Sequence, residues 1–242
     1  MKACCVVLLA FLLVIPTAGK AQVLNSKLKH KSNVLQKVLI MPAEINLRRS
    51  GLKGYEGMPD EADKLAANLT AAVSDWMAKH DVNLIPVPPA DGTVDTGEFT
   101  LQQMQRKYDA IEPQILRRPK GVVKGIFSLQ DDVAGYAPAG RADALVYIRG
   151  AGTLITRAER TMGSIPGPWM WATKNQRFDG RMAFVDARSG EILLFLEFSS
   201  YGYAWKGTAE ELIPRIKDSM LSLPVPIHTV LGPPASNSTR HP

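Results

Sequence analysis

Residues able to carry out acid–base or metal chemistry are few and scattered in this chain of 242 residues. The histidines form no His-x-x-x-His or His-x-Glu motif and no carboxylate–histidine cluster, the patterns that zinc sites need. His80 falls at the end of an expected helix, where it would cap the last carbonyls, and His30 and His241 fall in expected tails. We therefore expect no metal site, no cofactor and no histidine-based catalysis.

Nucleophilic and nucleotide-binding motifs are equally weak. Cys4 and Cys5 are the only cysteines and lie in the N-terminal apolar run, so the chain beyond it has no thiolate nucleophile, thiolate ligand or disulfide. Ser164 lacks the strand–turn–helix setting of a Gly-x-Ser-x-Gly elbow. Gly150 and Gly152 lack the third glycine and the following helix of a dinucleotide loop, and are more typical of a close-packed or bulged strand.

Two acidic pairs, Asp131–Asp132 and Glu210–Glu211, are the remaining candidates for catalysis. Helix caps and solvated faces explain both pairs, and we favour that explanation over glycosidase-type paired carboxylates. We therefore expect no catalytic residues. An enzyme with an unrecognised carboxylate site stays open as an alternative function.

The strongest candidate for a contact site is the segment 157–177, which combines aromatic and methionine side chains with basic ones. Loops are usually polar, whereas tryptophan and methionine favour contact surfaces. One interpretation is a docking or membrane-touching loop, and the other is that its two tryptophans fold back over a sheet. The candidate interaction residues are Arg157, Arg160, Met162, Trp169, Met170, Trp171, Lys174 and Arg177.

The N-terminus has the features of a signal peptide. Lys2 provides a positive start, residues 3–15 are apolar throughout, and small residues around Ala21 provide a peptidase site. The apolar run is shorter than the roughly 20 residues of a spanning helix, so an uncleaved anchor is the less favoured alternative. Because Cys4 and Cys5 precede the end of this run, we exclude a lipoprotein. We expect cleavage near Ala21 and a periplasmic or secreted protein.

The rest of the chain divides into three parts. Residues 22–36 are expected to be a flexible basic lead-in, residues 37–223 a single α/β domain, and residues 224–242 a disordered tail rich in proline and serine. The formal charge of +6 favours anionic lipid or polymer surfaces. We expect no nucleic-acid partner, and the oligomeric state stays open.

Hydrophobic patterns predict the elements of this domain. The apolar run 38–41 predicts a strand buried on both faces, and residues 59–80 predict an amphipathic helix that follows a glycine-rich loop at 51–57. Residues 181–186 and 191–199 predict a hairpin closed by the Asp186–Gly190 turn.

Weaker patterns complete the order of elements. They predict a strand at 82–87, a helix from 100 that ends before Pro113, short helical pieces to 135, a strand at 144–155 and a final helix from 208. The order is β-α-β-α-(α)-β-β-β-α. It predicts an α/β (α+β) fold with a single mixed β-sheet and helices packed on it.

The element order resembles that of an α/β fold found in envelope accessory proteins. Two sequence segments share this resemblance, ADALVYIRG at 142–150 and FVDARSGEILLF at 184–195. The family includes the N-terminal domain of TolB, LpoB and the periplasmic domain of CsgG. The resemblance implies a non-enzymatic protein–protein interaction module, acting as an accessory subunit of an envelope assembly or transport complex, with other envelope proteins as partners. The chain departs from the family because it lacks the lipid-bearing cysteine of many members, which favours a soluble periplasmic or secreted form. An anionic membrane- or polymer-binding protein that uses the loop 157–177 is the alternative.

Overall fold

The computed structural model describes residues 22–29, 35–51, 54–86, 101–130, 133, 135–136, 139–155, 177–201, 208–221 and 223. The expected signal peptide and C-terminal tail lie outside these residues. Among the helices in the described part of the chain, none combines the length and apolar character needed to cross a bilayer.

One mixed sheet forms the centre of the molecule, as predicted, and eight strands of the described residues take part in it. Its main path runs β1-β8-β7-β6-β2-β5, and β3 pairs with β6 beyond the end of β2, with β4 outside β3. The strands are β1 (Gln22–Leu24), β2 (Lys37–Ile40), β3 (Glu44–Gly51), β4 (Gly54–Gly57), β5 (Asn83–Ile85), β6 (Ala144–Ile155), β7 (Arg177–Asp186) and β8 (Ile192–Tyr201).

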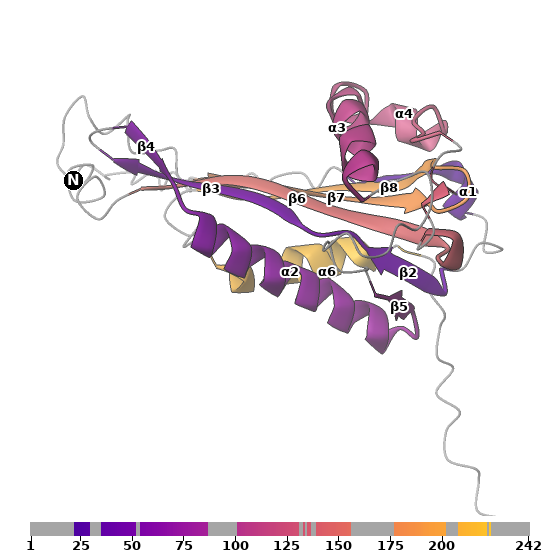
Figure 1. Cartoon of the computed structure of the whole chain (residues 1–242), viewed down its shortest axis with the longest axis horizontal. Helices are drawn as coiled ribbons and strands as arrows, with labels where there is room; N and C mark the ends of the chain where they lie inside the picture. Colours follow the sequence, from indigo (N-terminus) through magenta and orange to yellow (C-terminus); the bar gives the residue numbers. More distant parts are fainter. Residues whose placement is uncertain are drawn as a thin grey trace, which may run out of the picture.

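Helices cover both faces of the sheet (Figure 1). On one face lie α2 (Pro59–Lys79) and α6 (Ile213–Met220), and on the other lie α3 (Leu101–Arg117) and α4 (Lys120–Val123). Alternate residues of β6 enter separate cores: Val146 and Ile148 pack with α2, whereas Leu145 and Tyr147 pack with α3. Because it is covered on both sides, the centre of the sheet has the continuous apolar sequence expected of buried strands.

The predicted β7–β8 hairpin and its turn are confirmed. Asp186 Oδ1 accepts hydrogen bonds from the backbone N–H groups of Arg188 at 2.9 Å and Ser189 at 2.7 Å. Gly190 has a φ of +68°, a left-handed conformation that glycine adopts without steric cost. The strand predicted around Gly150 is also confirmed, and there a β-carbon on that glycine would overlap the ring of Phe178.

The prediction of a flexible lead-in over residues 22–36 is wrong for residues 22–29. Residues 22–24 form β1, which pairs antiparallel with β8, and Ser26–Lys29 form the short helix α1. Asn25 and Leu28 are buried, and the backbone N–H of Asn25 donates to Leu193 O at 2.8 Å. Buried hydrogen bonds to the edge of the sheet order a segment whose own composition is polar.

Three further predictions need correction. The glycine-rich loop predicted at 51–57 is mostly the hairpin β3–β4, because β3 pairs along β6 from Glu44 to Ser50 and buries Leu47. The helix expected to end before Pro113 continues to Arg117, because Ile115 beyond the proline is buried in the core. The final helix also starts later than predicted, since residues 209–211 form a 3₁₀ turn ahead of α6.

Candidate functional site

The candidate loop of the sequence analysis lies almost wholly outside the described residues. Of its eight residues only Arg177 is described: it is the exposed first residue of β7 and forms an ion pair with Asp179. The other seven are Arg157, Arg160, Met162, Trp169, Met170, Trp171 and Lys174. The loop therefore stays a prediction.

Two of the other chemical candidates have structural roles. The ring of His80 stacks on Trp76 with centroids 4.0 Å apart, and its Nδ1 lies 2.8 Å from Trp76 O, so it caps the end of α2. Glu210 is exposed in the 3₁₀ turn, where hydrogen bonds from its own backbone N–H and from the Thr208 hydroxyl lower its pKa. Asp131 and Asp132 lie outside the described residues. Within the described chain, no three histidine, cysteine or carboxylate side chains form a group suited to a metal ion.

A partly buried charge network joins α3 to the sheet, with Arg149 and Glu112 buried and Glu44 and Asp109 about half exposed. Arg149 of β6 forms ion pairs with Glu44 of β3 at 3.1 Å, with Glu112 of α3 at 3.7 Å, and with Asp109 of α3. Arg181 of β7 forms a further ion pair with Glu112 at 3.2 Å. Each described carboxylate of the network thus faces a guanidinium. None of these carboxylates is therefore free for proton transfer, and the role of the network is to position α3 on the sheet.

Burial is the main cause of three pKa shifts around this network. It raises the pKa of Glu44, against the attraction of Arg149, and raises the pKa values of Tyr108 and Tyr147. The hydroxyl of Tyr147 and Oε1 of Glu112 are buried and make no hydrogen bond with the described residues. The sequence alone does not predict this network. Its one signal is that Asp109 and Glu112 stand three residues apart, on one face of a helix.

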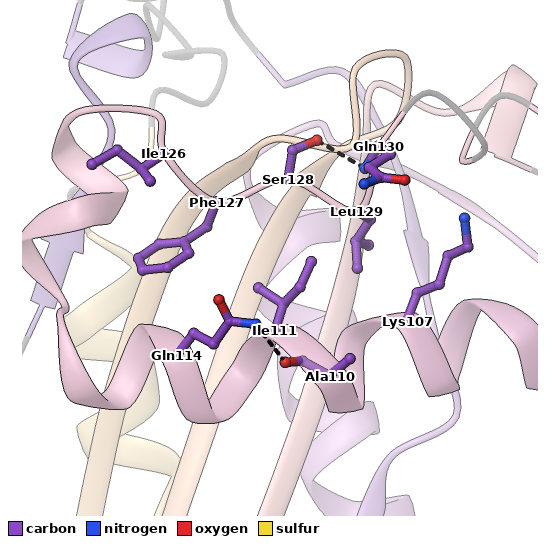
Figure 2. A pocket seen from close by; sticks show the side chains of 9 residues that line it. All are labelled: Lys107, Ala110, Ile111, Gln114, Ile126, Phe127, Ser128, Leu129 and Gln130. Carbon is purple, nitrogen blue, oxygen red and sulfur yellow. Dashed lines mark hydrogen bonds between the residues drawn. The ribbon is translucent and has the colours of Figure 1, made fainter.

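An open groove of about 340 Å³ lies between α3 and residues 126–130. Figure 2 shows Phe127 and Leu129 on this segment facing Ile111 on α3. Phe127 and Leu129 belong to the buried core and Ile111 packs against it, and polar side chains provide most of the exposed surface of the groove. The lining residues are Lys107, Ala110, Ile111, Gln114, Ile126, Phe127, Ser128, Leu129 and Gln130.

Hydrogen bonds hold the outer wall of the groove against the β7–β8 turn. Leu129 N donates to Gly190 O at 2.8 Å, and Ser128 Oγ donates to Ser189 O at 2.9 Å. Phe127 O accepts from Ile192 N at 3.0 Å. The opposite wall, α3, is held by the charge network. Both walls are thus fixed by the domain itself, so the groove is preformed.

No protein-family model and no curated protein matches this chain. Among solved structures, the chain is similar to a PelC dodecamer from Paraburkholderia phytofirmans, with 7% identity and a TM-score of 0.37 over 84% of this chain and 94% of that chain. It is also similar to lipoprotein GNA1162 from Neisseria meningitidis, with 11% identity and a TM-score of 0.31 over 77% of this chain and 96% of that chain. A third similar structure is the LpoB C-terminal domain from Salmonella enterica, with 15% identity and a TM-score of 0.25 over 73% of this chain and 87% of that chain. LpoB belongs to the family that the two sequence segments resemble. These likenesses concern the fold alone.

Proposed function

We propose that this chain is an exported, non-enzymatic binding module of the cell envelope that docks a partner protein in the groove between α3 and residues 126–130. The groove is the observation that carries the proposal. Three apolar side chains lie at its base, polar side chains line its rim, and both walls are held by hydrogen bonds or ion pairs. This is the anatomy of protein-recognition sites, in which an apolar centre is surrounded by a polar border.

The size of the groove favours a side chain of a partner protein over a large ligand. Its volume of about 340 Å³ lies at the lower end of the range of roughly 300–1,000 Å³ for ligand pockets. Binding energy at interfaces is concentrated in a few buried anchors that fill such pockets. An aliphatic or aromatic anchor of the partner would pack on Ile111, Phe127 and Leu129.

Site-specific cross-linking in the cells that produce the protein tests this proposal. A photoreactive residue at Gln114, exposed on the groove rim, should cross-link to one discrete envelope protein. The same residue at Asp75, exposed on α2 on the other face of the sheet, should not.

A pair of matched tryptophan variants tests whether the groove itself binds the partner. Ala110→Trp places an indole into the groove from an exposed position of α3 and should abolish the cross-link at Gln114. Ala71→Trp makes the same change at an exposed position of α2 and should leave the cross-link intact. Identical products from Gln114 and Asp75, or a cross-link that survives Ala110→Trp, would rule out the groove as the docking site.

A further inference from the structure

The turn from α3 through α4 carries charge of one sign on its outer surface. We call residues 116–126 the basic turn. Arg117, Arg118, Lys120 and Lys124 are all exposed in it, and none of them forms an ion pair within the described part of the chain.

The acidic residues of the same unit are few and lie outside the basic turn in the sequence. Between residues 101 and 130 the only acids are Asp109 and Glu112, and both pair with Arg149 at the sheet. The outer surface therefore presents cations without carboxylates between them, and it attracts anions.

Aliphatic side chains are exposed among these cations. Ile126 is 65% exposed and Leu116 is 39% exposed, at the two ends of the basic turn. Single exposed aliphatic residues are common on protein surfaces, but a basic segment flanked by them is the composition of proteins that lie on anionic membranes.

The basic turn is held rigidly. Gly121 lies against the ring of Phe127, closely enough that a β-carbon there would overlap the ring, and α4 packs on β1 and β8. Backbone hydrogen bonds from Ile126 N to Gly121 O at 3.0 Å and from Gly121 N to Arg118 O at 2.8 Å close the turn on itself. The cations therefore project from a rigid backbone, so little backbone conformational entropy is lost when the turn binds a partner.

We propose that the basic turn binds the surface of an anionic lipid bilayer, with its four cations at the phosphate headgroups and Ile126 and Leu116 at the headgroup–acyl boundary. Two observations favour a bilayer over an acidic protein. None of the four cations lines the groove, so they meet an open surface rather than a recess. The exposed aliphatic residues flank the cations, which suits a partner that is both charged and apolar across a wide area. The four cations lie outside the groove, and Ile126 is the one residue of the basic turn that also lines it.

Vesicle co-sedimentation tests the proposal. The protein is used in its exported form, with its N-terminus read by mass spectrometry, because the apolar run 3–15 would itself enter lipid. Binding is measured to phosphatidylcholine vesicles with and without phosphatidylglycerol, at low and high salt. We expect binding only with phosphatidylglycerol, and weaker binding at high salt.

Matched charge reversals separate the basic turn from the net charge of the protein. Lys120→Glu with Lys124→Glu should weaken vesicle binding by at least about 25-fold, since each basic residue near an anionic surface contributes about five-fold. Lys64→Glu with Lys79→Glu makes the same change in net charge at exposed positions of α2 and should have little effect. Equal losses in the two double variants would overturn the proposal.

Matched apolar changes test the insertion of Ile126. Ile126→Ser should weaken binding several-fold, whereas Leu221→Ser, at a side chain that is 70% exposed beside α6, should not.

Soluble polyglutamate tests whether the partner is an acidic protein instead. The membrane proposal would be overturned if the protein bound polyglutamate but not vesicles, and if the Lys120/Lys124 variant lost that binding. Lys120→Glu with Lys124→Glu changes no residue of the groove and should leave the cross-link at Gln114 intact, so failure of the groove proposal and failure of this one are distinguishable. Circular dichroism confirms that each variant is folded.

Discussion

Tyr108 of α3 lies face to face with Tyr147 of β6, with ring centroids 4.3 Å apart and ring planes 11° apart. The guanidinium of Arg149 lies 4.8 Å from the centroid of the Tyr108 ring, at a distance typical of a cation–π contact. This stack and the ion pairs of Arg149 are concentrated at one point between α3 and the sheet. The position of the helical wall of the groove therefore depends on a small number of side chains.

Replacing Arg149 should destabilise the fold. The side chain is only 11% exposed, and Arg149→Met leaves Glu44, Asp109 and Glu112 without their shared cation. Glu44 and Asp109 are about half exposed and Glu112 keeps Arg181, so we expect a loss of about 1–3 kcal/mol in the free energy of unfolding. Urea denaturation at neutral pH measures the loss. The control is Arg49→Met, which breaks the exposed pair between Arg49 and Glu61 and should cost less than about 1 kcal/mol. Similar losses in the two variants would mean that the network does not hold α3.

Tyr147 should make the fold sensitive to alkali. Burial raises its pKa above the ordinary value of 10.0, so above that pH the unfolded chain releases a proton that the folded chain keeps. The contribution of Tyr147 to the free energy of unfolding is therefore constant below pH 10, and the free energy of unfolding falls as the pH rises above 10. Tyr147→Phe removes this loss. It should also change stability little at neutral pH, because the buried hydroxyl has no hydrogen-bond partner among the described residues.

The measurement is urea denaturation at neutral pH and near pH 11, with tyrosinate absorbance at 295 nm followed in parallel. The wild-type chain should lose more stability between the two pH values than Tyr147→Phe does. An equal alkaline loss in both proteins would show that Tyr147 ionises as freely in the folded chain as in the unfolded one.

Local sequence patterns predicted the elements that their own residues determine. The alternation around β6, the stripe of α2 and the Asp186–Gly190 turn each have a signal within a few residues, and each is confirmed. Long-range pairing explains the failures. β3 is a strand because it lies along β6, about a hundred residues away in the chain, and its flanking glycines resemble a loop in isolation.

The candidate site was missed for the same reason. The groove has one wall from α3 and the other from residues that hydrogen-bond to the β7–β8 turn, and no local pattern relates them. The charge network likewise depends on strand register, which places Arg149 between Glu44 and Arg181. The sequence shows an Asp109–Glu112 pair on a helix but not the arginines that face it.

The predicted tryptophan loop should form a contact surface distant from the groove. The described residues on either side of it, Ile155 of β6 and Arg177 of β7, lie at the opposite end of these strands from the turn that holds the groove wall. The nine residue-to-residue steps from Ala144 to Thr153 correspond to about 30 Å of strand. We expect Trp169→Ala with Trp171→Ala to abolish capture of the envelope partner, measured by the cross-link at Gln114, if that partner contacts both ends of the sheet. An unchanged cross-link would remove the loop from the contact surface of this partner.

Gly125 should be essential for the packing of the N-terminal strand β1 against the sheet. Its φ of +65° is left-handed, and a β-carbon there would overlap Glu191 Oε1. That oxygen accepts a 2.8 Å hydrogen bond from Asn25 Nδ2, and both side chains are buried. Gly125→Ala combines the cost of a left-handed alanine with displacement of a buried hydrogen bond, so we expect a loss of about 2–4 kcal/mol. Gly57→Ala is the control, because nothing lies within 4 Å of a β-carbon there.

Hydrogen exchange separates this local effect from general destabilisation. Asn25 N donates to Leu193 O, and β1 pairs with Leu194–Leu196 of β8, so loss of the Asn25–Glu191 contact should expose the amides of β1 first. In Gly125→Ala we expect the amides of residues 23–25 to exchange faster by a larger factor than those of β6 and β7, which lie in the middle of the sheet. Equal acceleration across all strands would indicate that the residues around Gly125 support the whole fold, rather than anchoring the segment that follows the expected cleavage site.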